Sequence, residues 1–357
     1  MLSFSLSFEK RDFLPAVIGA GISLIMLKTG FLSLFFLVPM GFVAYRYHYR
    51  VAWLAFLLAF LGNAVLTVAY ATGRALPSEA IGWDILYYSA ITFIFIWIIA
   101  SPSSLQTKMS WPVRLIAGSC LGSLLFNFIL FRNMDSQAFF EYVSYFVNSL
   151  VTAYQSTKID VVQNAMLESL TPEFVTEMIM AFMLRGGSLV SCVLLFFVCC
   201  QLSLILARLS FRLFGKNIQG KNSGETRLNE ISPLAVFHVN PMVIWFFSSS
   251  LFLIVITRTI KFEIPEIILW NVLIICSILY LAQGLGIMQF FLIKPSFSPF
   301  LRMILVIAFV FVLFSPFLNA FLLGGLILLG IAENWLPLRV SKQSGPPSTP
   351  EAGGGES

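Results

Sequence analysis

The chain has 357 residues, of which 58% are hydrophobic and only 11% are charged, and its mean hydropathy is +0.89. Soluble domains carry about 25% charged residues, and a water-soluble chain of this size could not bury so much apolar surface. The composition therefore excludes an ordinary soluble enzyme, a disordered protein and a nucleic-acid-binding module. It predicts an all-α, polytopic integral membrane bundle with the lipid bilayer as its solvent, and it attributes the net charge of +5 to basic loops.

In chain order, ten apolar segments are predicted to form membrane helices. A helix needs about 20 residues to cross a hydrocarbon core about 30 Å thick. The first and last pairs are shorter, and their members are separated by Lys28-Thr29-Gly30 and by Ser315-Pro316. Each short pair could instead be a re-entrant hairpin or partly merge, which would leave eight segments. The predicted segments cover residues 13–27, 31–45, 51–71, 85–100, 113–131, 187–207, 242–257, 267–293, 303–314 and 317–332.

The basic residues predict which side of the membrane each loop occupies. If both termini are cytoplasmic, 15 of the 22 Lys and Arg residues fall on the cytoplasmic side and 7 outside, which agrees with the positive-inside rule. The loop 208–227 carries the densest positive charge and anchors this orientation. Residues 1–340 are predicted to form one transmembrane domain, and residues 341–357, rich in Pro, Gly and Ser, a disordered tail.

The longest predicted extramembrane stretch is 132–185, between the fifth and sixth segments. Apolar residues such as Phe139 and Val143 recur there at helical spacing and are interrupted by polar residues, which indicates amphipathic helices on the outer surface. Thr171 followed by Pro172 is typical of a helix start. These helices either cover an outward-facing cavity or pack at the membrane interface.

The sequence contains no recognisable catalytic or metal-binding motif. A Walker A loop, HExxH and GxSxG are all absent from the sequence. The five cysteines lie in apolar runs, and the two histidines, His48 and His238, are far apart in sequence. We therefore expect neither an enzyme nor a bound metal or cofactor.

Seven amide side chains fall inside the apolar segments, where an unpaired polar group is unfavourable. They either join helices by hydrogen bonds or line a cavity for a neutral or weakly polar substrate. Beyond the last segment, Glu333 and Arg339 are predicted to form an interfacial ion pair. The candidate amides are Asn63, Asn127, Gln201, Asn271, Gln283, Gln289 and Asn319.

Pairs of small residues four positions apart mark candidate helix contacts. Gly118 and Gly122 form a GxxxG pair in the fifth segment, and Ala16 and Ala20 form a similar pair in the first. Small residues let two helix backbones approach closely in a membrane. These pairs are candidates either for packing within the chain or for docking a partner helix.

Several short runs near the C-terminus support a family resemblance. They are Asn271, the tripeptide Gln283-Gly284-Leu285, and residues 329–339 with the sequence LGIAENWLPLR. On these runs the chain resembles the YybS-like family of uncharacterised bacterial polytopic membrane proteins, although that family more often has Asp where Glu333 stands. The resemblance implies a bacterial cytoplasmic membrane location.

A more distant resemblance is to the substrate-binding membrane components of energy-coupling-factor transporters. In those proteins an Ala-xxx-Ala pair in the first helix docks against a coupling subunit, and Ala16 and Ala20 match that spacing. This resemblance implies a transport-type fold and identifies no ligand.

Two functions follow from these observations. The first is a solute-binding membrane component of a transporter, for which other membrane subunits or a coupling ATPase supply energy, since the chain has no nucleotide site. The second is a non-catalytic membrane scaffold or assembly factor for the cell envelope. A polar cavity lined by the candidate amides favours the first function, whereas amides packed between helices favour the second.

Overall fold

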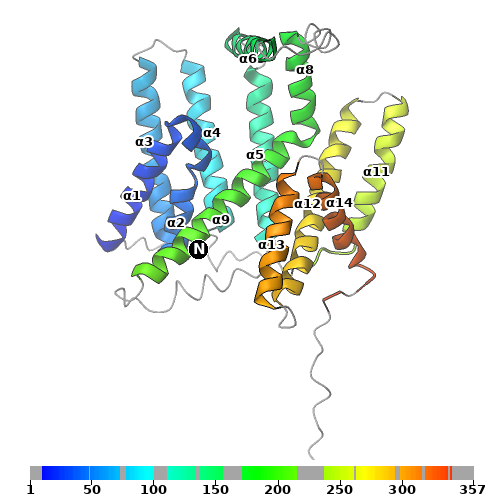
Figure 1. The fold of residues 1–357 in the computed structure, drawn as a ribbon. Coiled ribbons are helices and arrows are strands. Elements are labelled where there is room, and N and C mark those ends of the chain that lie inside the picture. Colours follow the sequence, from blue (N-terminus) through cyan, green and yellow to red (C-terminus); the bar gives the residue numbers. More distant parts are fainter. Residues whose placement is uncertain are drawn as a thin grey trace, which may run out of the picture. The chain divides into compact units, whose positions relative to one another are not determined.

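Every element in the described part of the computed structural model is a helix (Figure 1). The predicted disordered tail at 341–357, and residues 156–170 of the predicted amphipathic insert, lie outside the described residues. The same is true of most of the basic loop, at 215–236. The described residues are 10–47, 49–72, 78–99, 111–133, 137–155, 171–214, 237–260, 263–293, 298–315, 318–336 and 338–339.

The helices overlap the predicted apolar segments, although several begin or end a few residues away from the predicted bounds. The second segment, predicted as one helix over 31–45, is a 3-10 helix followed by a turn and a short α-helix, with Pro39 in the first turn of the latter, a position that suits proline. The helices are α1 (Lys10–Leu27), η1 (Gly30–Phe35), α2 (Val38–Arg46), α3 (Tyr49–Thr72), α4 (Ser78–Ile99), α5 (Trp111–Asn133), α6 (Gln137–Gln155), α8 (Pro172–Phe182), η3 (Met183–Gly187), α9 (Ser188–Phe214), α11 (Val243–Ile260), α12 (Glu263–Ile293), α13 (Pro299–Phe314) and α14 (Leu318–Ala332).

Five helical stretches in the described part of the chain are long and apolar enough to cross a membrane. They are Arg50–Ala69, Trp111–Asn133, Pro172–Phe211, Val243–Ile260 and Pro265–Leu292. The shorter apolar helices are Phe13–Leu27, Leu32–Arg46, Ile85–Ile99, Phe300–Phe309 and Leu318–Ala332. The prediction of an all-helical chain is therefore confirmed for the described residues, and five of its helical stretches have the length and composition of membrane spans. The number of helices that cross a membrane remains a prediction.

The contacts group the chain into two units, each described here by itself. Unit 1 comprises Met1–Ser232 with Trp245–Cys276, and unit 2 comprises Pro233–Ile244 with Ser277–Ser357. The division falls within α11 and α12, so both helices contribute to both units.

The core of unit 1 forms where α1, α2, α4, α5 and α9 meet. Phe95 of α4 and Phe196 of α9 are fully buried there, with ring centroids 6.0 Å apart. A second cluster joins α1, α2 and α3 through small residues, among them Ala16 and Ala55. Short side chains at these contacts allow the helices to pack closely.

The outward surface of the long helices is apolar. In α3, Leu57, Leu61 and Val65 lie on one face at intervals of four residues, and all three are more than half exposed. Such a stripe would be unfavourable in water and is expected where a helix faces lipid. This surface supports a bilayer as the surroundings of the chain.

Two amphipathic helices stand at one end of α5 in unit 1. Figure 1 shows α6 lying across that end, and α6 packs against α8 through Val143, Val147 and Val175. Thr171 caps α8 as predicted, because its Oγ1 accepts a hydrogen bond from the backbone N–H of Phe174 at 3.2 Å. The described part of the predicted insert is therefore helical and amphipathic.

A break at Gly186 separates α8 from α9. The apolar stretch Pro172–Phe211 has 40 residues, about 60 Å as a straight helix, which is twice the thickness of the hydrocarbon core. The chain interrupts this stretch with the π-helical turn η3, in which Gly186 has a φ of 114°. An L-residue rarely adopts that conformation, so glycine is needed at this position.

We expect Gly186→Ala to lower the stability of unit 1 by about 1–3 kcal/mol, because alanine is strained at this positive φ and its Cβ would overlap Ile274. Gly21→Ala in α1 is the matched control, since nothing lies within 4 Å of a Cβ there and alanine favours the helix. Denaturation in detergent, followed by circular dichroism, measures both. Equal stability of the two variants would contradict the proposed need for glycine at 186.

Candidate functional site

A small cavity in unit 1 lies between α1, α3 and α4. Its volume is about 20 Å³, which is enough for one water molecule. Most of its lining is apolar, and the polar side chains that reach it come from all three helices. These polar residues are Ser23, Asn63, Tyr88, Ser89 and Thr92.

Asn63 and Ser23 are the most deeply buried of the cavity's polar residues, each with 3% of the residue exposed. Asn63 Oδ1 accepts a hydrogen bond from Thr67 Oγ1 at 3.4 Å, and Thr67 Oγ1 in turn accepts one from Lys28 Nζ at 3.4 Å. Asn63 Nδ2 and Ser89 Oγ are buried without a hydrogen-bond partner. Leaving such groups unpaired costs about 1–3 kcal/mol each, so an occupant that accepts hydrogen bonds would be stabilised in this cavity.

A second polar centre of unit 1 surrounds the break at Gly186. Asn271 Nδ2 donates to the backbone oxygens of Leu184 at 2.7 Å and of Ile267 at 2.9 Å. The break removes regular helix hydrogen bonds from this turn, and the predicted amide Asn271 supplies a replacement donor. It therefore acts as a helix contact in this structure.

Two serines tie the start of α9 to α5 at the same break. Ser188 Oγ donates to the backbone oxygen of Met183 at 3.0 Å. Ser188 Oγ also lies 2.7 Å from Ser123 Oγ, and because Ser188 has already donated its one proton to Met183, Ser123 is the donor in this second bond. Both serines are buried, so the hydroxyls satisfy each other without water.

An ion pair lies beside the break. Arg185 Nη2 is 3.7 Å from Glu266 Oε1, and Trp270 Nε1 donates to the same oxygen at 3.3 Å. The Glu266 carboxylate is buried, whereas the Arg185 side chain is partly exposed. Arg185, a residue of η3, therefore places a positive charge beside the Glu266 carboxylate.

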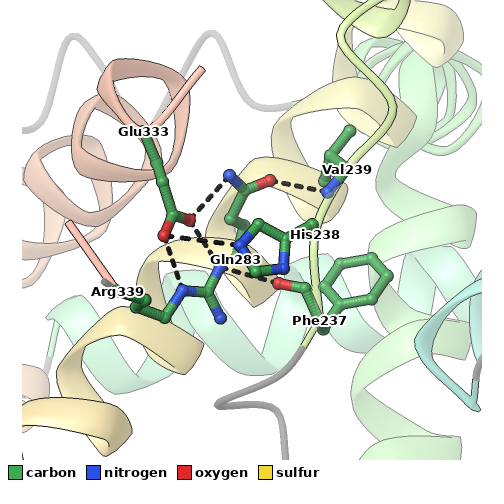
Figure 2. Close-up of polar contacts among 6 residues, drawn as sticks. All are labelled: Phe237, His238, Val239, Gln283, Glu333 and Arg339. Carbon is green, nitrogen blue, oxygen red and sulfur yellow. Dashed lines mark hydrogen bonds and ion pairs between the residues drawn. The ribbon is translucent and has the colours of Figure 1, made fainter. Parts of the chain in front are cut away.

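A polar cluster of unit 2 is centred on Gln283 of α12 (Figure 2). Only 1% of Gln283 is exposed. Its Oε1 accepts from the backbone N–H of Val239 at 2.8 Å, and its Nε2 donates to Glu333 Oε2 at 2.9 Å. One amide thereby joins α12 to the segment before α11 and to the end of α14.

Glu333 and Arg339 form the predicted ion pair, which the structure confirms. Arg339 Nε donates to Glu333 Oε1 at 2.6 Å, and Arg339 Nη2 donates to the other carboxylate oxygen and to the backbone oxygen of Phe237 at 2.8 Å. The side chains are 3% and 4% exposed, respectively. His238 Nε2 lies 3.7 Å from Glu333 Oε1 on the open side (Figure 2). A two-pronged pair of this kind has a fixed geometry, and the further hydrogen bond from Arg339 to Phe237 connects residues 102 positions apart.

Opposing effects determine the pKa of Glu333, which follows the end of α14. Burial raises it, whereas hydrogen bonds from Arg339 and Gln283 and the nearby charges of Arg339 and His238 lower it. The net pKa lies below the ordinary value of 4.5. Glu333 is therefore ionised at neutral pH and acts here as a hydrogen-bond acceptor.

Two glycines allow α12 and α14 to cross beside this cluster. A Cβ at Gly284 would overlap the backbone of Leu326, and a Cβ at Gly330 would overlap the backbone of Tyr280. Asn334 Nδ2 also donates to Tyr280 Oη at 3.3 Å. Gly284 and Gly330, which belong to the runs that carry the predicted family resemblance, therefore lie at a close crossing of α12 and α14.

The remaining predicted amides are not gathered at either site. Asn127 is half-buried and its Oδ1 is buried without a partner. Gln201, Gln289 and Asn319 are also half-buried. None of these four belongs to the described lining of the cavity, so a cavity that unites all seven amides is not found among the described residues.

The predicted small-residue pairs pack within the chain. A Cβ at Gly118 would lie 2.6 Å from Ile98 Cδ1, and one at Gly122 would lie 3.3 Å from Ile91 Cδ1, so this pair fits α5 against α4. Ala16 and Ala20 are buried against α2 and α3. Docking of a partner at this pair remains a prediction and would require α1 to separate from those helices.

Several residues of these sites were not singled out from the sequence. Thr67 extends the Asn63 contact by one helical turn, and Ser123 and Ser188 are ordinary residues for a membrane helix. Among these residues, Glu266 could have been noticed in the sequence, because it is an acidic residue directly before a predicted apolar segment. Hydroxyl pairs 65 residues apart have no signature in a single sequence.

Comparison with known proteins finds no matching family model, no matching curated protein and no matching solved structure.

We expect Arg339→Met to destabilise unit 2 by about 3–5 kcal/mol, because it leaves the buried Glu333 charge unpaired. The backbone oxygen of Phe237 also loses its charged donor. Hydrogen exchange at the Val239 amide should accelerate, since the cluster holds its acceptor in place. Arg258→Met, at an exposed position of α11, is the control, and equal exchange in both variants would contradict the assigned role.

Acid should weaken the same cluster. A carboxyl whose pKa is lowered by folding contributes stability above its unfolded-state pKa, and this contribution is lost as the pH falls through the folded-state pKa. The midpoint of detergent-induced denaturation should therefore decrease when the pH is lowered below 4.5, the ordinary pKa of a Glu side chain. Glu333→Gln should lack this component, and an identical acid profile in that variant would show that Glu333 is not its source.

Proposed function

We propose that the chain is a multi-pass membrane protein of transporter type that binds a small solute. The observation that carries this proposal is the unpaired Asn63 Nδ2 in the cavity between α1, α3 and α4. A buried donor without a partner is uncommon in folded proteins. It is accounted for if an acceptor on a solute, or a water that a solute displaces, occupies the cavity.

The chemistry of the cavity indicates the class of solute. Asn63 and Ser89 offer hydrogen-bonding groups within a mostly apolar wall, an arrangement that suits a neutral molecule with an apolar body and a hydrogen-bond acceptor. In the hydrogen bonds described, the Lys28 ammonium is connected to the Asn63 amide only through Thr67. An amide oxygen, or another uncharged carbonyl oxygen, directed toward Asn63 Nδ2 fits these contacts.

A solute larger than water requires the cavity to open. Its wall on the α1 side consists of Ser23, Leu24 and Leu27, and Leu24 lies close to Gly62 of α3. We propose that α1 moves away from α3 when a solute enters. The turn at Lys28-Thr29 and the turn after Phe35 would be the hinges of such a motion.

The finer membrane description is part of the same proposal. It comprises ten spans, or eight with re-entrant pairs, both termini in the cytoplasm, and the cytoplasmic membrane of a bacterium. Kinship with the YybS-like family, and partnership with other membrane subunits or a coupling ATPase, also belong to it. Support comes from the apolar helices and the distribution of basic residues.

A membrane scaffold is the second candidate function. It is favoured by Asn271 and Gln283, whose amides bond to the chain itself. Amides used in this way join helices and leave no group for a solute. On this alternative the protein would copurify with a stable membrane partner, and the Asn63 cavity would hold only water.

Replacing Asn63 tests the solute site. We expect small molecules with a hydrogen-bond acceptor to be extracted from the purified wild-type protein and identified by mass spectrometry. In Asn63→Leu, whose side chain cannot donate a hydrogen bond, we expect their amount to fall at least about tenfold, which corresponds to about 1.4 kcal/mol of binding free energy.

Asn127→Leu is the matched control, because Asn127 is an intramembrane amide outside the described cavity lining. Its bound molecules should equal those of the wild type. Identical extracts from all three proteins, together with a stoichiometric membrane partner, would reject the solute site and support the scaffold.

A further inference from the structure

A basic site of unit 1 is separate from the cavity and from the helix break. It is formed by arginines from three helices around Tyr45, near the end of α2. Arg114 of α5 and Arg208 of α9 both lie within electrostatic reach of the Tyr45 phenol. Arg46 stacks on Phe211 of α9, with its guanidinium carbon 3.9 Å from the ring centroid. Three guanidinium groups therefore gather at neighbouring helix ends.

Tertiary packing fixes the position of this site. Tyr45 is buried against Leu204 and Ala207 of α9, and Phe211 packs on the same cluster. Trp111, the first residue of α5, has its ring centroid 6.2 Å from that of Phe197. Apolar contacts thus hold the end of α2 and the start of α5 against α9, and so fix the relative positions of the helices that carry the arginines.

The site has buried donors that no acceptor satisfies. Arg114 Nε and Trp111 Nε1 are both buried without a hydrogen-bond partner. Within the described residues, none of the three arginines forms an ion pair with an acidic side chain. The start of a 23-residue helix, α5, adds backbone N–H groups and the positive end of its dipole. Apart from the Tyr45 phenol and the ring of Phe211, the groups identified at this site are donors or positive charges.

We propose that this basic site binds a phosphate group, with Arg114, Arg208 and Trp111 as its principal donors. Phosphate offers several strong acceptor oxygens, and arginine binds it through parallel hydrogen bonds. A single anion would pair the buried Arg114 Nε and Trp111 Nε1 and would offset the repulsion among the guanidinium groups. A neutral ligand could pair these two donors but would not offset the repulsion among the guanidinium groups.

The surroundings indicate where the phosphate comes from. The arginines stand at the ends of apolar helices, which is the depth of lipid headgroups, and basic pockets between helices bind anionic lipids there. All three also belong to the side predicted as cytoplasmic. An anionic phospholipid headgroup is the source consistent with this position, and a free phosphate ion offers the same chemistry.

The test measures the apparent unfolding temperature of the whole chain in detergent micelles. Micelles doped with phosphatidylglycerol should raise this temperature above that in micelles doped with phosphatidylcholine, whose headgroup carries no net charge. In the double variant Arg114→Gln/Arg208→Gln we expect at least half of the rise to be lost. Trp111→Phe, which keeps the ring and removes one donor, should lose a smaller part.

Arg132→Gln is the matched control, since it removes one charge from the exposed, opposite end of α5. It should keep the full rise. If the double variant keeps the rise, or if Arg132→Gln loses as much, the proposal is overturned. Should the double variant fail to fold, Trp111→Phe alone decides, and an unchanged rise in it overturns the proposal.

A third arm separates the two sources of phosphate. Inorganic phosphate is added to undoped micelles at constant ionic strength, because salt screens exposed charges. No rise with phosphate, together with the rise in phosphatidylglycerol, assigns the site to a lipid headgroup. If inorganic phosphate raises the unfolding temperature as much as phosphatidylglycerol does, and the double variant loses this rise, the result supports the phosphate site and assigns it to a soluble ion.

Discussion

Polar groups inside a hydrocarbon core must find hydrogen-bond partners within the protein, because lipid tails offer none. This constraint explains why side-chain hydrogen bonds accompany the break between α8 and α9. Gly186 interrupts the helix at a positive φ, and Asn271 and Ser188 donate to carbonyl oxygens of the same turn. The helix can be interrupted there because Asn271 of α12 and Ser188 of α9 itself supply hydrogen bonds to the carbonyl oxygens of the turn.

The unit 2 cluster meets the same requirement with charged groups. Glu333 and Arg339 are both buried, and desolvation makes such a pair costly unless its hydrogen bonds are complete. Gln283, the backbone oxygen of Phe237 and the guanidinium fork complete them. The cluster thus holds three segments distant in sequence, while Gly284 and Gly330 allow their helices to approach.

Where the requirement is not met, the molecule has candidate binding sites. Asn63 faces a cavity with an unpaired amide N–H, and Arg114 and Trp111 have unpaired donors among positive charges. The first environment is apolar and suits a neutral acceptor, whereas the second is cationic and suits an anion. The same measure, a buried donor without a partner, therefore distinguishes two sites with different ligand chemistry.

The sequence by itself determined the all-helical class, the apolar segments, the Thr171 cap and the Glu333–Arg339 pair. These features depend on composition, on local spacing, or on residues only six positions apart. It also marked Asn63, Asn271 and Gln283 as polar residues in apolar surroundings. Tertiary structure alone decided that Asn63 meets a cavity while Asn271 and Gln283 bond to the chain itself, and that Arg46, Arg114 and Arg208 lie at neighbouring helices. The reason is physical: partners 44 to 87 residues away are selected by helix packing, which no local pattern records.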